Sequence, residues 1–324
     1  MAKKNANLHN AKKARNDEFY TMLTDIEKEM KYYRSQFKGK VIYCNCDDAR
    51  ESNFFKYFAN NFEFLGLKKL VTTGYKAEGK GVVLVYEGDK NGNRMVDDNE
   101  IITRELEGNG DFRSEECIEF LKEADIVVTN PPFSLFREYV AQLMEYGKKF
   151  IVFGNMNAVT YKEIFPYIKD NKLWFGASIH SGDRKFYVPD NYPLEAAGCG
   201  IDEDGKRYIK VKGVRWFTNM YHEEIKPLDL YARYSNESYP KYDNYDAIEV
   251  SKTAEIPMDY DGVMGVPITF LDKYCPEQFE IVDINPHFFM MVAQGLPKPK
   301  QLTLHSVGRK DPYARILIRK KISA

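Results

Sequence analysis

The stretch DIVVTNPPF, residues 125–133, decides the fold expected of this chain. It begins with a short, mostly apolar run of the kind that forms a buried strand. Asn-Pro-Pro then ends the strand, because proline fixes φ and has no amide hydrogen for a sheet ladder. A helix capped by Ser134 and reaching Tyr146 is predicted next, followed by a strand over residues 149–153. This order is typical of a parallel sheet whose strands are joined by helices.

The same alternation extends along the chain. Thr24 to Glu27 fit a capping box, which predicts a helix to about Phe37. The further elements are strands at 41–46 and 69–73, a helix from Ser52 through Leu65, a helix from Ser114 to Glu123, a helix near 161–169 opened by a capping box at 160–163, and a β-rich run at 208–214. We therefore predict an α/β protein with a Rossmann-like, doubly wound parallel sheet.

Residues 82–86 and 100–106 predict an inserted hairpin or sheet edge. The turn between them, residues 89–100, places oxygen-bearing side chains at positions 1, 3, 5, 9 and 12 of a calcium loop. Position 6 is Arg94, where the sharp turn favours Gly, and strands flank the segment instead of helices. A polar hairpin turn is therefore the favoured interpretation, and the sequence indicates no metal site.

Composition places the chain among globular proteins. It has 324 residues, 44% of them hydrophobic, enough for one large domain or a domain with an appendage. The five Cys lack C-x-x-C spacing and are expected to be reduced thiols in cytoplasm, and the five His show no ligand spacing. No apolar stretch approaches the ~20 residues of a membrane span, and the basic, polar start is unlike a signal peptide.

Three parts are expected along the chain. Residues 1–15 predict a flexible basic arm that contacts DNA, although a solvated tail would have the same composition; its lysines are Lys3, Lys4, Lys12 and Lys13. Residues 16–226 predict a catalytic domain, and the Tyr-rich, Pro-punctuated residues 227–324 a region that recognises the DNA target. Because the net charge is only −1, a nucleic acid would have to meet a local basic surface.

The segment Asn130-Pro131-Pro132-Phe133 carries the predicted chemistry. It follows a buried strand, at the carboxyl end where open α/β sheets bind ligands. The Asn130 side-chain oxygen and the Pro131 carbonyl could each accept a hydrogen from the exocyclic amine of adenine, which localises its lone pair for attack on a sulfonium methyl. Pro132 stiffens the loop, and Phe133 offers a flat face to an extruded base. The alternative is a plain strand-ending turn.

Other residues are candidates for cofactor and DNA contacts. Asp111 could accept from the cofactor's adenine amino group while Phe112 packs on the ring, and the end of the first strand could hold its ammonium or ribose; these strand-end residues are Asn45, Cys46 and Asp47. Phe19, Tyr20 and Thr21 form a further candidate segment. Asn155, Asn157 and Trp216 could lie beside the target base. The alternative for Asp111 is a turn residue, and for the end of the first strand a solvated acidic loop. The alternative for the Phe19 segment is a buried aromatic pair, and the last three residues could be core strand ends.

Several segments together resemble the EcoRI-type adenine-specific methyltransferase family. They are NDEFYT (16–21), YCNCDD (43–48), ESNFFKYF (51–58), TNPPF (129–133), FGNMN (153–157) and VRWFTN (214–219). The likeness runs from about residue 5 to the end of the chain. It implies a Rossmann-like methyltransferase fold, S-adenosylmethionine as cofactor, and methylation of the N6 amine of adenine in double-stranded DNA.

The resemblance also assigns roles to residues. Phe19 to Thr21 and Asp111-Phe112 would line the cofactor pocket, and Asn130 to Phe133 the pocket for the target base. No obligate protein partner is implied, and a monomer is compatible with the sequence. One departure is that residues 46–52, after the first strand, form no glycine-rich turn. The alternatives are methylation of another planar amine (cytosine N4, RNA adenine or protein glutamine) and a catalytically inactive DNA-binding relative.

Overall fold

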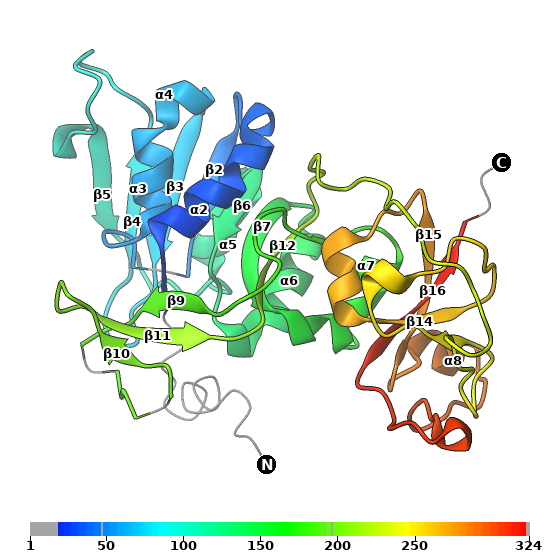
Figure 1. The fold of residues 1–324 in the computed structure, drawn as a ribbon. Coiled ribbons are helices and arrows are strands. Elements are labelled where there is room, and N and C mark those ends of the chain that lie inside the picture. The colour runs from blue at the N-terminus through cyan, green and yellow to red at the C-terminus, as the bar shows by residue number, and fades with distance from the viewer. Residues whose placement is uncertain (1–18, 47, 191, 196, 322–324) are drawn as a thin grey trace. The chain divides into compact units, whose positions relative to one another are not determined.

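The computed structural model describes residues 19–46, 48–190, 192–195 and 197–321, and its chain forms two compact units. The first unit comprises the chain through Ala158 together with Phe175–His222, and the second comprises Val159–Trp174 and the chain from Glu223 onward. Residues 159–174 therefore leave the stretch predicted as the catalytic domain and join the second unit. Figure 1 shows the path of the chain.

A mixed sheet forms the centre of the first unit. Four parallel strands, in the order β3-β2-β6-β7, make up its middle: β2 (Val41–Cys44), β3 (Lys69–Gly74), β6 (Ile126–Thr129) and β7 (Lys149–Asn155). Antiparallel strands extend both sides, so that the full order is β5-β4-β3-β2-β6-β7-β12-β8. The outer strands are β4 (Val82–Tyr86), β5 (Ile101–Glu105), β12 (Val214–Thr218) and β8 (Trp174–Phe175). The predicted Rossmann-like architecture and its edge hairpin are confirmed, with a mixed sheet in place of a wholly parallel one.

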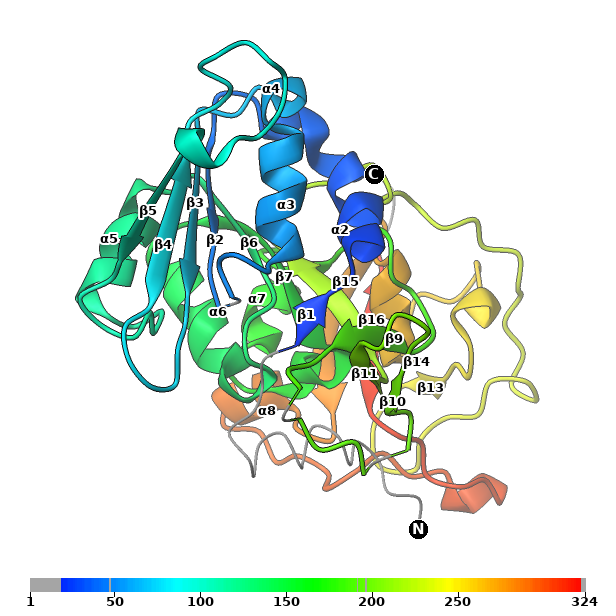
Figure 2. The ribbon, with the colours of Figure 1, turned by 90° about the vertical axis from the view of Figure 1, so that its left-hand side faces the viewer.

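Helices cover both faces of this sheet (Figure 2). α2 (Leu23–Met30) and α3 (Asn53–Asn60) lie on one face, and α5 (Glu115–Glu123) and α6 (Phe136–Glu145) on the other. α6 buries Phe136, Tyr139, Val140 and Leu143, a spacing that places all four side chains on one face of a helix. The parallel strands are buried on both faces and are accordingly almost continuous apolar runs.

The predicted helix starts were partly correct. Ser52 accepts from the amide of Phe54, and Ser114 from the amide of Cys117, as N-cap residues do. The caps predicted at Thr24, Ser134 and Thr160 are wrong. The first helix begins after Met22, and α6 begins after Leu135 because the single 3₁₀ turn Phe133–Leu135 comes first. A 3₁₀ segment, Met156–Thr160, likewise precedes α7 (Phe165–Lys169).

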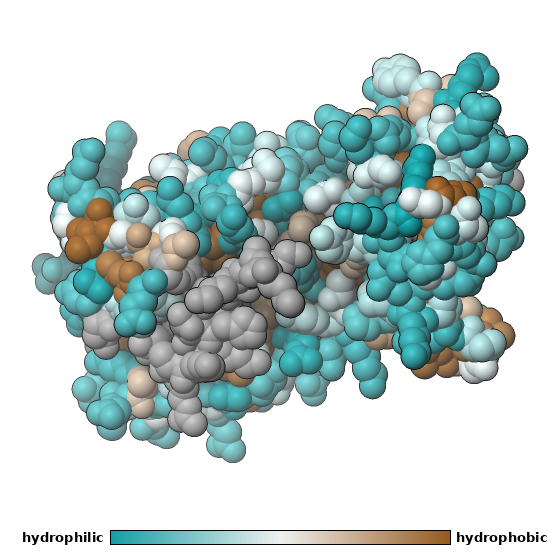
Figure 3. Space-filling view, turned by 60° about the horizontal axis from the view of Figure 1, so that its bottom comes forward, coloured by the Kyte–Doolittle hydropathy of each residue, from teal (hydrophilic) through white to brown (hydrophobic). Residues whose placement is uncertain are grey.

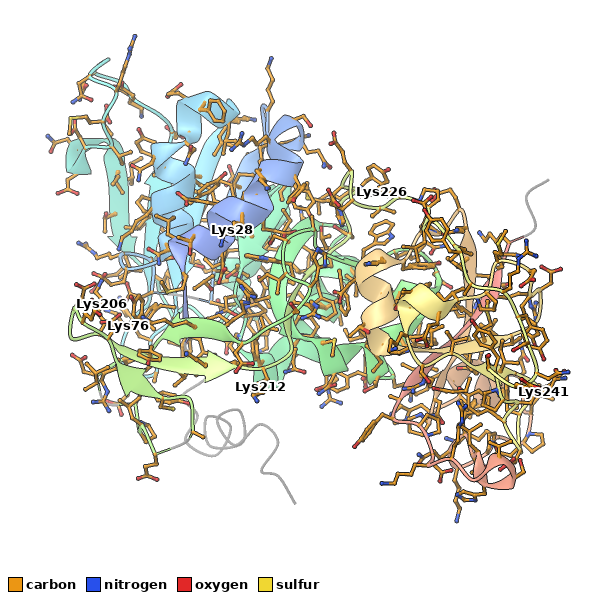
Figure 4. All side chains as sticks on the ribbon, viewed as in Figure 1. Lys28, Lys76, Lys206, Lys212, Lys226 and Lys241 are labelled. Carbon is orange, nitrogen blue, oxygen red and sulfur yellow. The ribbon has the colours of Figure 1, made fainter. Side chains whose placement is uncertain are left out.

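A second, four-stranded sheet of the first unit was not predicted. Its order is β1-β9-β11-β10, with β1 (Tyr20–Thr21), β9 (Arg184–Tyr187), β10 (Gly200–Ile201) and β11 (Arg207–Val211). β1 pairs antiparallel with β9, so that Thr21 lies opposite Phe186. The sheet thus joins the first described residues to a segment more than 160 positions later. Lys206 and Lys212 mark the two ends of β11 in Figure 4.

The second unit has its own sheet and core. The sheet order is β13-β14-β16-β15, with β13 (Ile248–Glu249), β14 (Met264–Pro267), β15 (Phe279–Asn285) and β16 (Arg315–Lys320). Its helices are α7 and α8 (Phe289–Ala293), and the first unit also holds α4 (Phe62–Leu65). The short 3₁₀ segments elsewhere are Lys31–Gln36, Asp98–Glu100, Thr253–Glu255, Ile268–Lys273 and His305–Val307. Arg315 forms a buried ion pair with Glu249 at 2.7 Å, which ties β16 to β13.

The surface is largely polar. Hydrophilic side chains dominate the face shown in Figure 3. Tyr231 and Tyr313, both of the second unit, are among the exposed aromatic residues. Of the helices that the structure describes, none combines the length and apolar character that crossing a membrane requires.

Gly154, near the carboxyl end of β7, packs where no side chain fits. A Cβ there would lie 2.5 Å from the ring of Phe136 and 2.9 Å from that of Phe217. We expect Gly154→Ala to lower the free energy of unfolding by about 1–3 kcal/mol, because the two buried rings must move. The midpoint of urea unfolding measures this change. Gly108→Ala is the control: a Cβ at this exposed position meets nothing within 4 Å, and a shift as large as that of Gly154→Ala would contradict the packing argument.

Candidate active site

The candidate site lies where the strand order of the main sheet reverses. β2 is followed along the chain by β3 on one side, whereas β6 and β7 lie on the other side, so the reversal falls between β2 and β6. Open α/β sheets bind ligands beyond the carboxyl ends of their strands at such a point. Asn45 follows β2 and Asn130 follows β6. The Thr129 hydroxyl donates to the carbonyl of Asn45, which ties the two strand ends together.

The Asn130 side chain is held by a hydrogen bond from its amide nitrogen. Its Nδ2 donates to the carbonyl of Phe19 at 2.7 Å, and the residue is 6% exposed. Its Oδ1 is buried and receives no hydrogen bond from any described residue. An unsatisfied buried acceptor costs about 1–3 kcal/mol, so its retention at a sheet's ligand edge indicates an acceptor reserved for an incoming N–H group.

An aromatic cluster surrounds Phe133. The ring of Phe133 lies edge-on to Phe19, with centroids 5.9 Å apart, and to Phe186 of β9 at 6.4 Å. Phe19 also contacts Tyr192 at 6.1 Å. Phe19 and Phe186 are buried, whereas Phe133 is only partly buried. Phe133 is thus partly accessible to solvent, and it packs against aromatic rings from segments far away in the sequence.

Asn45 is fixed from α6. Tyr139 donates its hydroxyl hydrogen to Asn45 Oδ1, and both residues are buried. Burial raises the pKa of the Tyr139 hydroxyl well above its usual value, so this group stays protonated and remains a donor. Cys46, directly after Asn45, has a φ of +66°, the left-handed conformation that usually requires Gly. The tight turn that a glycine-rich loop would make is therefore made here by Cys46.

Asp111 and Phe112 lie next to a cation that the sequence analysis missed. Arg113 contacts both carboxylate oxygens of Asp111, at 2.8 and 2.6 Å. The Arg113 side chain lowers the pKa of Asp111, so the carboxylate is ionised and can only accept hydrogen bonds. The guanidinium also lies 5.2 Å from the ring centroid of Phe112, whose other contacts include Tyr139 at 5.0 Å. Asp111 thus remains an acceptor, with Arg113 as its standing partner.

A pocket opens at the carboxyl ends of β2 and β3. Its lining comes from the segments that follow these strands and from the start of β4, and the residues are Asp48, Ala49, Arg50, Gly74, Tyr75, Lys76 and Val82. Figure 4 marks Lys76. The Asp48 side chain accepts from the amides of Arg50 and Glu51 and so shapes one wall. The lining does not include Asn130 to Phe133, which places this pocket on the β3 side of the reversal point.

The residues predicted to contact DNA differ in their exposure to solvent. Trp216 is fully buried and stacks on Phe153 with centroids 3.7 Å apart, so the prediction that it contacts DNA is wrong. Asn155 is half-buried and uses both amide groups internally, through the carbonyl of Lys212 and the amide of Asn157. Asn157 is exposed. Asp47 and the arm lysines Lys3, Lys4, Lys12 and Lys13 lie outside the described residues.

Tyr20 and Thr21 position the segment that precedes α2. Tyr20 is half-buried in β1, and the carbonyl of Thr21 accepts from Asn53 Nδ2 at 2.7 Å. The structure therefore brings together Phe19, Asn45, Asn130 and Phe133. Tyr139, Phe186 and Arg113 were missed. Only Tyr139 left a signal, as a member of the apolar repeat of its helix; Phe186 joins through long-range strand pairing.

A Rossmann-type sheet with Asn-Pro-Pro-Phe at its reversal point, and with a buried amide oxygen awaiting a donor, defines a class of protein: methyltransferases that act on a planar amine. Comparison with known proteins narrows the class. Residues 7–321 match the family model described as "Adenine-specific methyltransferase EcoRI". The chain belongs to this family and is an adenine-specific DNA methyltransferase.

Relatives in the family match almost the whole chain. The chain is 49% identical to the type II methyltransferase M.EcoRI of Escherichia coli, over 97% of this chain and 96% of that protein. It is 41% identical to M.MpnI of Mycoplasma pneumoniae, over 96% and 97%, and 40% identical to M.MgeORF184P of Mycoplasma genitalium, over 96% and 98%.

The Tyr139 hydroxyl can be tested as a structural donor. We expect Tyr139→Phe to lower the free energy of unfolding by about 1–3 kcal/mol, because it leaves the buried Asn45 oxygen without its O–H donor. Chemical unfolding followed by tryptophan fluorescence measures the loss. Tyr231→Phe, at a residue that is 83% exposed, is the control and should change stability by less than about 0.5 kcal/mol. Equal stability of Tyr139→Phe and the wild type would show that the bond contributes nothing.

Proposed function

We propose that this chain transfers a methyl group from S-adenosylmethionine to the N6 amine of an adenine extruded from double-stranded DNA. The single observation that supports the proposal best is the unpaired, buried Oδ1 of Asn130 beside Pro131. Two acceptors at this corner would take the two amine hydrogens and turn the nitrogen lone pair out of the ring plane. The relatives' description as type II methyltransferases leads us to place the activity in restriction-modification.

Asn130 performs its role without a charge. Its Nδ2 bond to Phe19 fixes the orientation of the amide, so Oδ1 is the atom presented to substrate. The partly exposed ring of Phe133 is the surface for the extruded base, since stacking compensates for leaving the duplex. The amine nitrogen would bond to the methyl carbon as the sulfonium C–S bond breaks, S-adenosylhomocysteine would leave, and the methylated amine would pass its extra proton to water. Asn130 and Pro131 are acceptors in this step and need not take that proton.

The cofactor fits the β2 and β3 side of the site. When bound, S-adenosylmethionine supplies an electrophilic methyl group. Cys46 adopts the left-handed backbone conformation that a glycine of such a loop would adopt, and the neighbouring pocket contains Asp48 and Lys76. Asp111 is ionised and would accept from the cofactor's adenine amino group, while Phe112 packs near it. We assign the target base to Asn130 to Phe133 and the cofactor to Phe19 to Thr21, Asn45 to Asp47, and Asp111-Phe112.

The remaining assignments concern DNA. We propose that the second unit, to which residues 227–324 belong, recognises the sequence around the target adenine. The arm lysines would contact phosphates, and Asn155 and Asn157 would lie beside the target. Methylation of cytosine N4, RNA adenine or protein glutamine is the alternative chemistry, and an inactive DNA-binding relative is the alternative class. Mass analysis of digested, treated DNA separates these, because only the proposed activity yields N6-methyladenine there.

Asn130→Ala tests the catalytic assignment. We expect turnover to fall by about 100-fold or more, since removing one positioned electrostatic partner of a transition state costs on that order. Cofactor affinity, measured by calorimetry, should change little. Asn61→Ala is the matched control, because the Asn61 amide also donates to a main-chain carbonyl, that of Tyr57 at 2.8 Å, but at the end of α3. Near-normal N6-methyladenine formation by Asn130→Ala would remove the assignment.

The basic arm makes a separate prediction about salt. Changing Lys3, Lys4, Lys12 and Lys13 to Gln should reduce the slope of log affinity against log salt by about 0.9 for each lysine that contacts a phosphate. Fluorescence anisotropy with a DNA duplex over a salt series measures the slope. The control changes Lys56 and Lys122 to Gln, because both are exposed residues of the first unit that are already paired with a Glu, Glu51 and Glu119 respectively. An unchanged slope in the arm variant would identify the arm as a solvated tail.

A further inference from the structure

The loop between β4 and β5 gathers oxygen atoms at the edge of the main sheet. It comprises residues 89–100 and lies beside α4, as Figures 1 and 2 both show. Glu63 of α4 accepts the amide of Asp89 at 3.2 Å, which anchors the start of the loop. The loop is separate from the candidate active site, because none of the contacts described for that site involves residues 89–100.

The polar side chains of the loop point toward one another. The two carboxylate oxygens of Asp89 accept from the amides of Gly92 and Arg94, each at 2.6 Å. Asp97 Oδ2 accepts from the amide nitrogens of Asn91 and Asn93, each at 2.7 Å. Positions 1, 3, 5 and 9 of a calcium loop are thus occupied by side chains that form hydrogen bonds within the loop.

Arg94 stands at position 6, where a calcium loop usually has Gly, but it adopts the backbone conformation that this position needs. Position 6 of a calcium loop needs a sharp turn, for which Gly is the usual residue. Arg94 has a φ of +63°, the left-handed conformation that Gly adopts there. Asp89 stabilises this turn by accepting the Arg94 amide at 2.6 Å. The backbone therefore has the required path despite the missing glycine.

Glu100, at position 12, independently indicates that the loop can bind a cation. It is 7% exposed, and its Oε1 accepts from the amides of Lys90 and Asn91, at 2.7 and 3.2 Å, so the carboxylate points into the loop. Its Oε2 is buried and has no hydrogen-bond partner among the described residues. A buried carboxylate oxygen without a partner is costly unless a cation or donor compensates it.

We propose that residues 89–100 bind one Ca²⁺ ion. The ligands are side-chain oxygens of Asp89, Asn91, Asn93, Asp97 and Glu100, with the main-chain carbonyl of Met95 at position 7. Six oxygen-bearing groups that include three carboxylates satisfy the coordination that Ca²⁺ takes. Binding turns the two Asn amides over, so that their oxygens replace the nitrogens that now contact Asp97.

The ion has a structural role in this setting. Among the described residues, no three Asp, Glu, His or Cys side chains are already gathered closely enough to hold a metal, so the loop must tighten around the ion with its Asn and main-chain oxygens. Strands and a 3₁₀ turn flank the loop, so the ion would fix the β4–β5 hairpin at the sheet edge instead of opening a pair of helices.

Equilibrium dialysis with radioactive Ca²⁺ tests the site on the full chain after treatment with a chelator. The wild type should bind one ion, and Glu100→Gln should bind at least about tenfold more weakly, because it removes the bidentate charge at position 12. Asp89→Asn, at a half-buried loop residue, is the second variant and should weaken binding similarly. Asp98→Asn is the matched control: it removes the same charge from an exposed residue at position 10, which is not a ligand position, and should bind as the wild type does.

A second readout is thermal unfolding. Saturating Ca²⁺ should raise the unfolding temperature of the wild type and of Asp98→Asn, because the ion binds the folded loop. It should leave the unfolding temperatures of Glu100→Gln and Asp89→Asn nearly unchanged. No uptake by the wild type at millimolar Ca²⁺ would overturn the proposal. So would equal affinity of the wild type and the two ligand variants, since the ion would then bind elsewhere. Methyl transfer does not enter either measurement, so a failure of the proposed function would not affect the result.

Discussion

The hydrogen bonds across the reversal point between β2 and β6 are the constraint on which the rest of the site depends. Thr129 donates to the carbonyl of Asn45, Tyr139 donates to the side chain of Asn45, and Asn130 donates to Phe19. Two parallel strand ends, a helix and the start of the chain's described part are thereby fixed to one another. A strand end alone would leave these polar groups without partners, so the same bonds that satisfy the buried backbone also set the orientation of Asn130.

In this orientation the Asn130 Oδ1 atom is buried and has no hydrogen-bond donor among the described residues. The cost, about 1–3 kcal/mol, has to be offset by packing nearby, and the aromatic contacts of Phe19 with Phe186 and Tyr192 are available for this. Functional sites commonly retain such a local cost where the surrounding structure is well determined. The second sheet serves this purpose, because β9 brings Phe186 to Phe19 and Phe133.

The sequence was sufficient for elements with a local signal. Buried strands such as β6 and caps such as Ser114 followed from apolar runs and from a side chain beside its own helix. Long-range contacts leave no such signal: the pairing of β1 with β9 and the Trp216–Phe153 stack depend on residues far apart in the chain. The motif pointed to the segment that we propose for the target base, but the contact of Phe186 with Phe133 and the pairing of Arg113 with Asp111 could only come from the fold.

Three asparagines lie at the carboxyl ends of parallel strands of the main sheet, and the hydrogen bonds of their amides distinguish Asn130, for which we propose the acceptor role, from the other two. The Asn45 side-chain oxygen accepts from Tyr139, and Asn155 accepts from the amide of Asn157 and donates to the carbonyl of Lys212. Asn130 alone of the three keeps its oxygen unused while its nitrogen is engaged. A carboxylate there would face the Phe19 carbonyl with no hydrogen to donate and would repel it, and a hydroxyl would be too short to span both partners. An amide places a donor for the Phe19 carbonyl and an acceptor for an incoming N–H group in one rigid group, which is the role that we propose for Asn130.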